Sequence, residues 1–151
     1  MFHIVLYEPE IPANTGNIGR LCVATGATLH LVGRTGFHLD DRSVRRAGLD
    51  YWERVELVRH EDLAAFEAGQ DVERLFCFSA HASRPYTQVR YRPGDALLFG
   101  SESRGLPPEV LARHSGRVLL IPIPTGQVRS LNLANAVAIV LYEALRQVQG
   151  W

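Results

Sequence analysis

The sequence Phe99-Gly100-Ser101-Glu102-Ser103-Arg104-Gly105-Leu106-Pro107 leaves an apolar run and becomes a loop of small and polar residues. A second apolar run ends at Ile121-Pro122 and leads to Arg129-Ser130-Leu131-Asn132-Leu133-Ala134-Asn135-Ala136, where a long helical pattern begins. A third polar stretch, Asn14-Thr15-Gly16-Asn17-Ile18-Gly19-Arg20, follows the first apolar run of the chain. Loops that follow buried parallel strands meet at the carboxyl edge of the sheet. The three stretches therefore predict a shared ligand site.

Short apolar runs alternate with helical patterns on both sides of these loops. We expect strands near residues 3–7, 28–32, 55–58, 75–79, 96–99 and 118–121, and helices near 15–26, 40–47, 61–68, 108–113 and 132–149. This alternation predicts an α/β fold with a largely parallel sheet and helices on both faces. A length of 151 residues suits one domain, which we expect to span residues 1–151.

Composition limits the classes of function. The chain has 46% hydrophobic and 21% charged residues, no secretory leader pattern, and no apolar run of the roughly 20 residues needed to cross a bilayer. We therefore expect a cytoplasmic protein without a membrane partner. Cys22 and Cys77 lie in apolar patterns and are expected to be reduced core residues. The histidines show no metal-ligand spacing, so no metal is predicted.

The charges are balanced, and all the basic residues are arginines. Sixteen arginines balance the charge of sixteen acidic residues, so only local clusters of arginine can attract nucleic acid. Arginine binds phosphate bidentately and stacks on bases, although a lysine-free composition can also reflect genome composition or thermal adaptation.

The last predicted helix is apolar on nearly all sides. One face carries Leu133, Val137, Val140, Leu141, Ala144 and Val148, and another carries Ala134, Ala138 and Leu145. A helix of this kind is covered on more than one side. In a chain this small, the second cover is expected to be another subunit, which predicts a two-fold homodimer.

The three polar stretches, in this order, resemble the three motifs of the SPOUT methyltransferases. The resemblance runs from Val5-Leu6-Tyr7-Glu8-Pro9 to Leu141-Tyr142-Glu143-Ala144 and is strongest to the small bacterial tRNA 2′-O-ribose methyltransferases that modify wobble nucleotide 34, a cytidine or modified uridine. It implies a single-domain fold with a C-terminal deep trefoil knot. It also implies methyl transfer from S-adenosyl-L-methionine, with S-adenosyl-L-homocysteine as product. The implied partners are the tRNA anticodon stem-loop and a second subunit, which would be bound through the N- and C-terminal helices.

The resemblance also implies roles for individual residues. Cofactor binding would fall to Phe78, Ser79, Gly100, Ile121, Ile123, Ser130, Leu131 and Asn135, and catalysis to Arg20, Glu102, Ser130 and Asn132. Guanidinium stays protonated, so we expect Arg20 to bind phosphate and stabilise a developing alkoxide rather than act as a base. Glu102 would shape the pocket and pair with an arginine. Each of these residues also has a simpler structural role open to it. Gly100 could merely end a strand, and Arg20 could be an ordinary surface residue. Helix caps could account for Ser130, Asn14 and Asn17.

The implied RNA-binding residues are mainly basic and aromatic. They comprise Asn14, Arg42, Arg45, Arg46 and Tyr142, with Arg84, Arg90 and Arg92 around Tyr86 and Tyr91 as weaker candidates. Arginines can hold phosphates while aromatic rings stack on unpaired bases, although such stretches are often solvated surface. Tyr142 could instead pack at the dimer interface.

Other functions are possible for this scaffold. A nucleotide-binding oxidoreductase is disfavoured because the first strand is not followed by a GxGxxG turn, and no phosphate-binding Walker sequence occurs. Methylation of another tRNA or rRNA site, or a non-catalytic RNA-binding assembly factor, stays open. Three features depart from the resemblance: Ser101 stands where proline is common, Leu131 where methionine is frequent, and the loop 125–128 is about one residue short.

Overall fold

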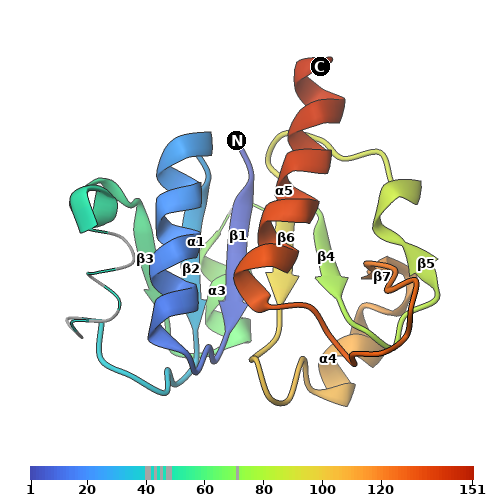
Figure 1. Ribbon diagram of the computed structural model, residues 1–151, viewed down its shortest axis with the longest axis horizontal. Helices are drawn as coiled ribbons and strands as arrows, with labels where there is room; N and C mark the ends of the chain where they lie inside the picture. Colours follow the sequence, from blue (N-terminus) through green and yellow to red (C-terminus); the bar gives the residue numbers. More distant parts are fainter. Residues whose placement is uncertain (40–41, 43, 45, 47–48, 71) are drawn as a thin grey trace.

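The fold is an α/β structure in which the chain alternates between a central sheet and the helices that cover it (Figure 1). The computed structural model describes residues 1–39, 42, 44, 46, 49–70 and 72–151. The strands are β1 (His3–Tyr7), β2 (Thr28–Val32), β3 (Leu57–His60), β4 (Leu75–Phe78), β5 (Arg84–Pro85), β6 (Ala96–Phe99) and β7 (Val118–Leu120). The helices are α1 (Pro12–Thr25), α3 (Leu63–Gly69), α4 (Pro108–Arg113) and α5 (Leu133–Gln149), with 3-10 turns η1 (Leu49–Arg54), η2 (Tyr86–Gln88) and η3 (Ser115–Arg117).

All the strand pairs of the sheet are parallel. The strand order is β3-β2-β1-β6-β4-β7-β5, so the two halves of the chain meet where β1 pairs with β6. The central strands β4 and β6 are buried at every position, which explains why they read as continuous apolar runs. The predicted α/β fold with a parallel sheet is confirmed.

Helices cover both faces of the sheet, as predicted. On one face, α1 and α5 contribute Ile18, Cys22, Val137 and Leu141 to a core with the side chains that β1, β2 and β6 present there. On the other face, α3 and α4 contribute Leu63, Phe66 and Val110 to a second core. Both cysteines are free and buried, in agreement with the prediction.

Several boundaries differ from the sequence prediction. Helix α1 begins at Pro12 rather than near residue 15, and β3 lies two residues later than expected. Asn14 and Asn17 lie inside α1, so neither is the cap that the sequence allowed. Strand β5 and η1 were not predicted; β5 has only two residues and leaves no periodic pattern. The helix expected over residues 40–47 lies largely outside the described residues.

Helix α5 is fixed at both ends by local signals. The side chain of its N-cap, Asn132, accepts a hydrogen bond from the backbone N–H of Asn135 at 3.2 Å. Gly150 ends the helix in the left-handed conformation, with φ of 75°. Ser130 is therefore not the cap of this helix.

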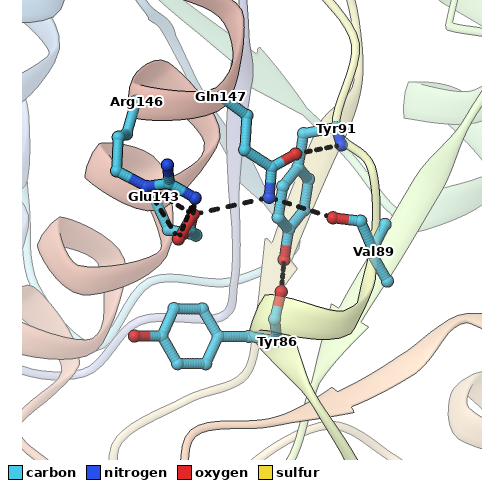
Figure 2. A network of polar contacts seen from close by, with 6 residues as sticks. All are labelled: Tyr86, Val89, Tyr91, Glu143, Arg146 and Gln147. Carbon is cyan, nitrogen blue, oxygen red and sulfur yellow. Dashed lines mark hydrogen bonds and ion pairs between the residues drawn. The ribbon is translucent and has the colours of Figure 1, made fainter. Parts of the chain in front are cut away.

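The other end of α5 is tied to the segment after β5. The side chain of Gln147 accepts a hydrogen bond from the backbone N–H of Tyr91 at 2.9 Å and donates one to the carbonyl of Val89 at 3.0 Å (Figure 2). The hydroxyl of Tyr91 donates to the carbonyl of Tyr86 at 2.6 Å, and Arg146 forms an ion pair with Glu143 at 2.9 Å. This network holds residues 86–91 against the C-terminal helix.

A row of three histidines crosses β1, β2 and β3. Nδ1 of His3 lies 2.9 Å from Nε2 of His30, and Nδ1 of His30 lies 3.0 Å from Nε2 of His60. Burial, followed by repulsion from the other two histidines, lowers the pKa of His30 to about 3. The ring of Phe66 packs edge-on against His30 and His60. The row is therefore held neutral within a largely apolar layer.

Candidate active site

The three polar stretches follow β1, β6 and β7 and meet at the carboxyl edge of the sheet, as predicted. In Figure 1 this is the lower edge, where the segment after β7 crosses back towards the start of α5. In chain order, the first stretch, residues 14–20, lies within α1, the second is the loop 100–107, and the third, residues 129–136, passes through the N-cap of α5 into that helix.

Glu102 joins the second stretch to the first. Its Oε1 accepts a hydrogen bond from the backbone N–H of Glu10 at 2.8 Å, and its Oε2 accepts one from the N–H of Ile11 at 2.8 Å. Oε2 also accepts from Nδ2 of Asn14 at 3.2 Å. The N-cap of α1 is Ile11, which has no capping side chain of its own, so the carboxylate of Glu102 satisfies backbone donors at the helix start.

A reciprocal contact strengthens this junction. The carboxylate of Glu10 accepts hydrogen bonds from the backbone N–H of Ser103 at 2.9 Å and from its hydroxyl at 2.6 Å. The hydrogen bonds from the side chain and then the backbone of Ser103 lower the pKa of Glu10. The loops after β1 and β6 therefore hold each other through two carboxylates, one from each loop.

Asn14 extends the chain of hydrogen bonds to the third stretch. Its Oδ1 accepts a hydrogen bond from Nδ2 of Asn132 at 3.0 Å, while its own Nδ2 donates to Glu102. Asn132 in turn caps α5. A continuous path from Glu102 through Asn14 to Asn132 thus links all three stretches, which are up to 118 positions apart in sequence.

A cavity of about 430 Å³ lies beside this path, between α1 and α5. Its lining is mostly amide and small apolar side chains: Asn14, Asn17, Leu21, Asn132, Ala134, Asn135 and Ala138. Arg20 lies on α1 but does not line this cavity. Its guanidinium carbon lies 4.9 Å from the centre of the Tyr51 ring, a cation–π contact that orients it toward η1. Gly19 allows this approach, because a Cβ there would lie 2.9 Å from the Trp52 ring.

The residues expected to bind the cofactor follow three adjacent strands. Phe78 ends β4 and stacks on Phe99 of β6 with ring centres 4.7 Å apart, and it pairs in register with Leu119 of β7. Ser79, Gly100, Ile121 and Ile123 continue from these strand ends, whereas Ser130, Leu131 and Asn135 lie at the start of α5. A Cβ on Gly100 would lie 2.1 Å from the carbonyl carbon of Gly105. The loop's own backbone therefore requires this glycine, independently of any ligand.

The RNA-binding candidates do not form one group. Arg42 and Arg46 are exposed, and Tyr142 is 45% exposed on α5, whereas Arg45 lies outside the described residues. Tyr91 is only 3% exposed and its hydroxyl is bonded to the carbonyl of Tyr86, so the expectation that it stacks on a base is wrong. Its ring fills the core beneath α5 instead.

Sequence reasoning missed three residues that shape the site. Glu10 and Ser103 form the second half of the junction, and Tyr51 contacts Arg20. The expected ion pair of Glu102 with an arginine is absent among the described residues, since backbone donors occupy its carboxylate. Only the position of Glu10 beside the first polar stretch could have suggested its role.

Two other features are absent from the part of the chain that the structure describes. No group of three or more histidine, cysteine, aspartate or glutamate side chains is placed to hold a metal ion. None of the described helices combines the length and apolar character needed to span a membrane.

Fold and site together define an α/β protein whose three polar stretches meet at the carboxyl edge of a parallel sheet, the edge at which open α/β sheets bind their ligands. The chain belongs to the SpoU rRNA Methylase family, whose model matches residues 1–142. The resemblance drawn from the three motifs is thereby confirmed at the level of the family.

Individual relatives are similar over nearly the whole chain. The tRNA (cytidine(34)-2'-O)-methyltransferase of Escherichia coli (strain K12) is 47% identical over 152 residues, covering 98% of this chain and 94% of the relative. A solved structure described as giving structural insights into the 2-OH methylation of C/U34 on tRNA has a chain that is 51% identical to this one. The match covers 100% of this chain and 98% of that chain, with a TM-score of 0.95. The AdoMet-bound rRNA methyltransferase of Sinorhizobium meliloti is 32% identical, covers 97% of this chain and 56% of its own, and has a TM-score of 0.85.

Proposed function

We propose that this protein transfers a methyl group from S-adenosyl-L-methionine to the ribose 2′-hydroxyl of the wobble nucleotide, cytidine or modified uridine 34, in tRNA. Membership of a methylase family and the high identity to tRNA (cytidine(34)-2'-O)-methyltransferases support this reaction. The observation in the structure that carries the proposal is the path from Glu102 through Asn14 to Asn132, because it fixes three motif loops as one site.

The residues at the strand ends suit S-adenosyl-L-methionine. Three adjacent strands end side by side, and the segment that crosses this edge leaves Val128 56% exposed as an apolar surface. Backbone at Phe78, Gly100, Ile121 and Ile123 would hold the cofactor, with Ser79, Ser130, Leu131 and Asn135 completing the pocket. The bound cofactor supplies an activated methyl group on its sulfonium sulfur, and S-adenosyl-L-homocysteine is the product.

Glu102 and Asn132 act by position in this proposal. The oxygens of Glu102 already accept hydrogen bonds from two backbone N–H groups and one side-chain amide, so we assign it to holding the loops rather than to proton transfer. Asn132 holds the start of α5 against Asn14. In-line methyl transfer depends mainly on such positioning. Ser130, which is exposed, is left free to contact ligand.

Arg20 is the catalytic residue of this proposal, and a second subunit would place it. Arg20 does not line the cavity of its own chain, and Ile139 and Tyr142, three positions apart on α5, form an exposed apolar strip. A homodimer through α1 and α5 would cover this strip and bring the partner's arginine to the site. Mixed dimers of an Arg20→Ala subunit and a cofactor-dead subunit should regain activity, and no recovery would contradict shared sites.

The remaining parts of the proposal concern the chain as a whole. Residues 1–151 form one domain, and the segment that returns from β7 to α5 threads the deep trefoil knot of the SPOUT fold. An experimental backbone trace that could be pulled straight from both ends would contradict the knot. A tRNA substrate favours the cytoplasm, and Arg42, Arg45, Arg46, Asn14 and Tyr142 are the proposed contacts to the anticodon stem-loop.

Methyl transfer from labelled S-adenosyl-L-methionine to unmodified bulk tRNA tests the function directly. Mass spectrometry of the product should place a ribose methyl at nucleotide 34, and Arg20→Ala should abolish it while cofactor binding persists. A methyl at another tRNA or rRNA nucleotide would replace the proposed substrate. Cofactor binding without transfer to any RNA would favour a non-catalytic RNA-binding factor.

A further inference from the structure

A second pocket lies at the same edge of the sheet, beyond the ends of β2 and β3. It has a volume of about 510 Å³ and is lined by Arg34, Thr35, Phe37, His38, Leu39 and Arg59. Pockets of 300–1,000 Å³ are of the size that holds a nucleotide or a similar ligand. None of these residues belongs to the three motif stretches, and the proposed cofactor and catalytic residues lie elsewhere.

Hydrogen bonds fix the pocket wall to the loop that Glu102 holds. The N–H of Gly33 donates to the carbonyl of His60 at 3.0 Å, and the N–H of Gly36 donates to the carbonyl of Pro9 at 3.0 Å. Pro9 immediately precedes Glu10, whose own N–H donates to Glu102. Pro9 and Glu10 therefore connect the wall of this pocket to the junction that Glu102 holds.

The pocket carries positive charge and one aromatic ring. Arg34 and Arg59 are both exposed, and neither guanidinium forms an ion pair among the residues that the structure describes. The acidic group behind the wall is Glu8, whose carboxylate accepts a hydrogen bond from the backbone N–H of Arg34 at 3.3 Å. Phe37 is half-buried, yet within the described part of the chain it belongs to neither core, whereas the neighbouring Leu39 packs on the first.

We propose that this pocket binds the RNA strand next to the methylated nucleotide, with a backbone phosphate held by Arg34 and Arg59 and an unpaired base stacked on Phe37. Guanidinium groups grip phosphate, and aromatic rings are the usual platforms for bases of single-stranded loops. Because the chain has no net charge, a local pair of arginines beside the site is the kind of feature that can hold the strand in register. This inference rests on the proposed function, since it extends the same substrate beyond the reacting ribose.

Binding of a fluorescent, unmodified anticodon stem-loop at several salt concentrations, in the presence of S-adenosyl-L-homocysteine, tests the proposal. Each phosphate contact contributes about 0.7 to the salt slope of single-strand binding, and Arg34 and Arg59 share one phosphate in this proposal, so Arg34→Gln/Arg59→Gln should make the slope shallower by about 0.7. We expect the same double variant to weaken binding by roughly tenfold or more at moderate salt.

The matched control removes two arginines elsewhere. Arg113, on α4, forms an ion pair with Glu67, on α3, and Arg117 lies directly before β7. Neither arginine lines the pocket. Arg113→Gln/Arg117→Gln loses the same charge and should leave the salt slope unchanged. Phe37→Leu should weaken binding by at least about fivefold without changing the slope, because stacking is not a charge contact.

The outcomes separate this inference from the proposed function. Equal affinity and salt slope for the pocket variant and the control, in a protein that still methylates tRNA, would overturn the pocket assignment alone. Wild-type protein that binds cofactor but methylates no RNA would overturn the proposed function first. A pocket that binds a free mononucleotide as tightly as the stem-loop would also contradict the inference, because it would then serve a separate small ligand.

Discussion

Removing the carboxylate of Glu102 should loosen the junction of the three loops and lower stability. Glu102→Ala deletes acceptors for the N–H groups of Glu10 and Ile11 and for the side-chain amide of Asn14. Losing the cap of a helix costs about 0.5–2 kcal/mol, and one hydrogen bond to a charged group is worth about 1.5–3 kcal/mol before solvent replaces it. Since Glu102 is only half-buried and water can reach the orphaned donors, we expect a total loss of about 2–3 kcal/mol.

Urea unfolding and thermal melting would measure this loss. For a chain of about this length, 1 kcal/mol corresponds to roughly 2–4 °C, so the midpoint should fall by about 4–12 °C. Glu102→Gln keeps one acceptor oxygen and should lose about half as much. Cofactor affinity and methyl transfer should fall in the same order, with the alanine variant lower than the glutamine variant.

Two results would refute this reasoning. If Glu102→Ala melts within 1 °C of wild type, the hydrogen bonds across the loops contribute nothing to stability. If Glu102→Gln is as stable as wild type but loses all methyl transfer, the carboxylate charge itself takes part in the reaction, and a positioning role is wrong. Ser103→Ala, which removes the 2.6 Å hydrogen bond to Glu10, serves as the matched test of the reciprocal contact.

Three further predictions concern groups outside this junction. The pKa of His30 is about 3 in the folded protein, against an ordinary value of 6.5. As the pH falls, the unfolded chain therefore takes up the proton first. The contribution of His30 to the free energy of unfolding should be complete above pH 6.5 and fall toward pH 3 by at most about 1.4 kcal/mol per pH unit. The urea midpoint of His30→Gln should fall less steeply over that window than that of wild type, and parallel curves would contradict the assignment. Tyr51→Leu removes the cation–π contact with Arg20, worth about 0.5–1 kcal/mol at an exposed site, and should lower kcat about two- to fivefold with cofactor affinity unchanged. Tyr51→Phe keeps the ring and should behave as wild type; equal losses in both variants would implicate the hydroxyl instead. Gln147→Ala leaves the N–H of Tyr91 and a neighbouring carbonyl without partners and should cost about 1–3 kcal/mol in urea unfolding, whereas an unchanged midpoint would mean that water replaces the amide.

Local sequence carried enough information to predict most of the elements. Buried strands such as β4 and β6 are continuous apolar runs, and α5 is a long stretch without glycine or proline. The alternation of these elements predicted the parallel sheet, and the rule that loops after parallel strands share one edge predicted that the three polar stretches would meet. Both predictions depend only on periodicity and connectivity, which are properties of the chain itself.

The tertiary structure decided how those loops are joined. The start of α1 depends on a distant residue, because its N-cap, Ile11, has no capping side chain and its N–H donates to Glu102, 91 positions away. For the same reason the sequence did not show that Glu10 and Ser103 bond to each other, and Tyr91 was predicted to contact RNA although Gln147, from α5, holds it against the core. The second pocket arises only where the ends of β2 and β3 lie beside the loop after β1. A sequence determines which residues favour strand, helix or turn, whereas contacts between distant residues depend on which strand ends the folded sheet places side by side.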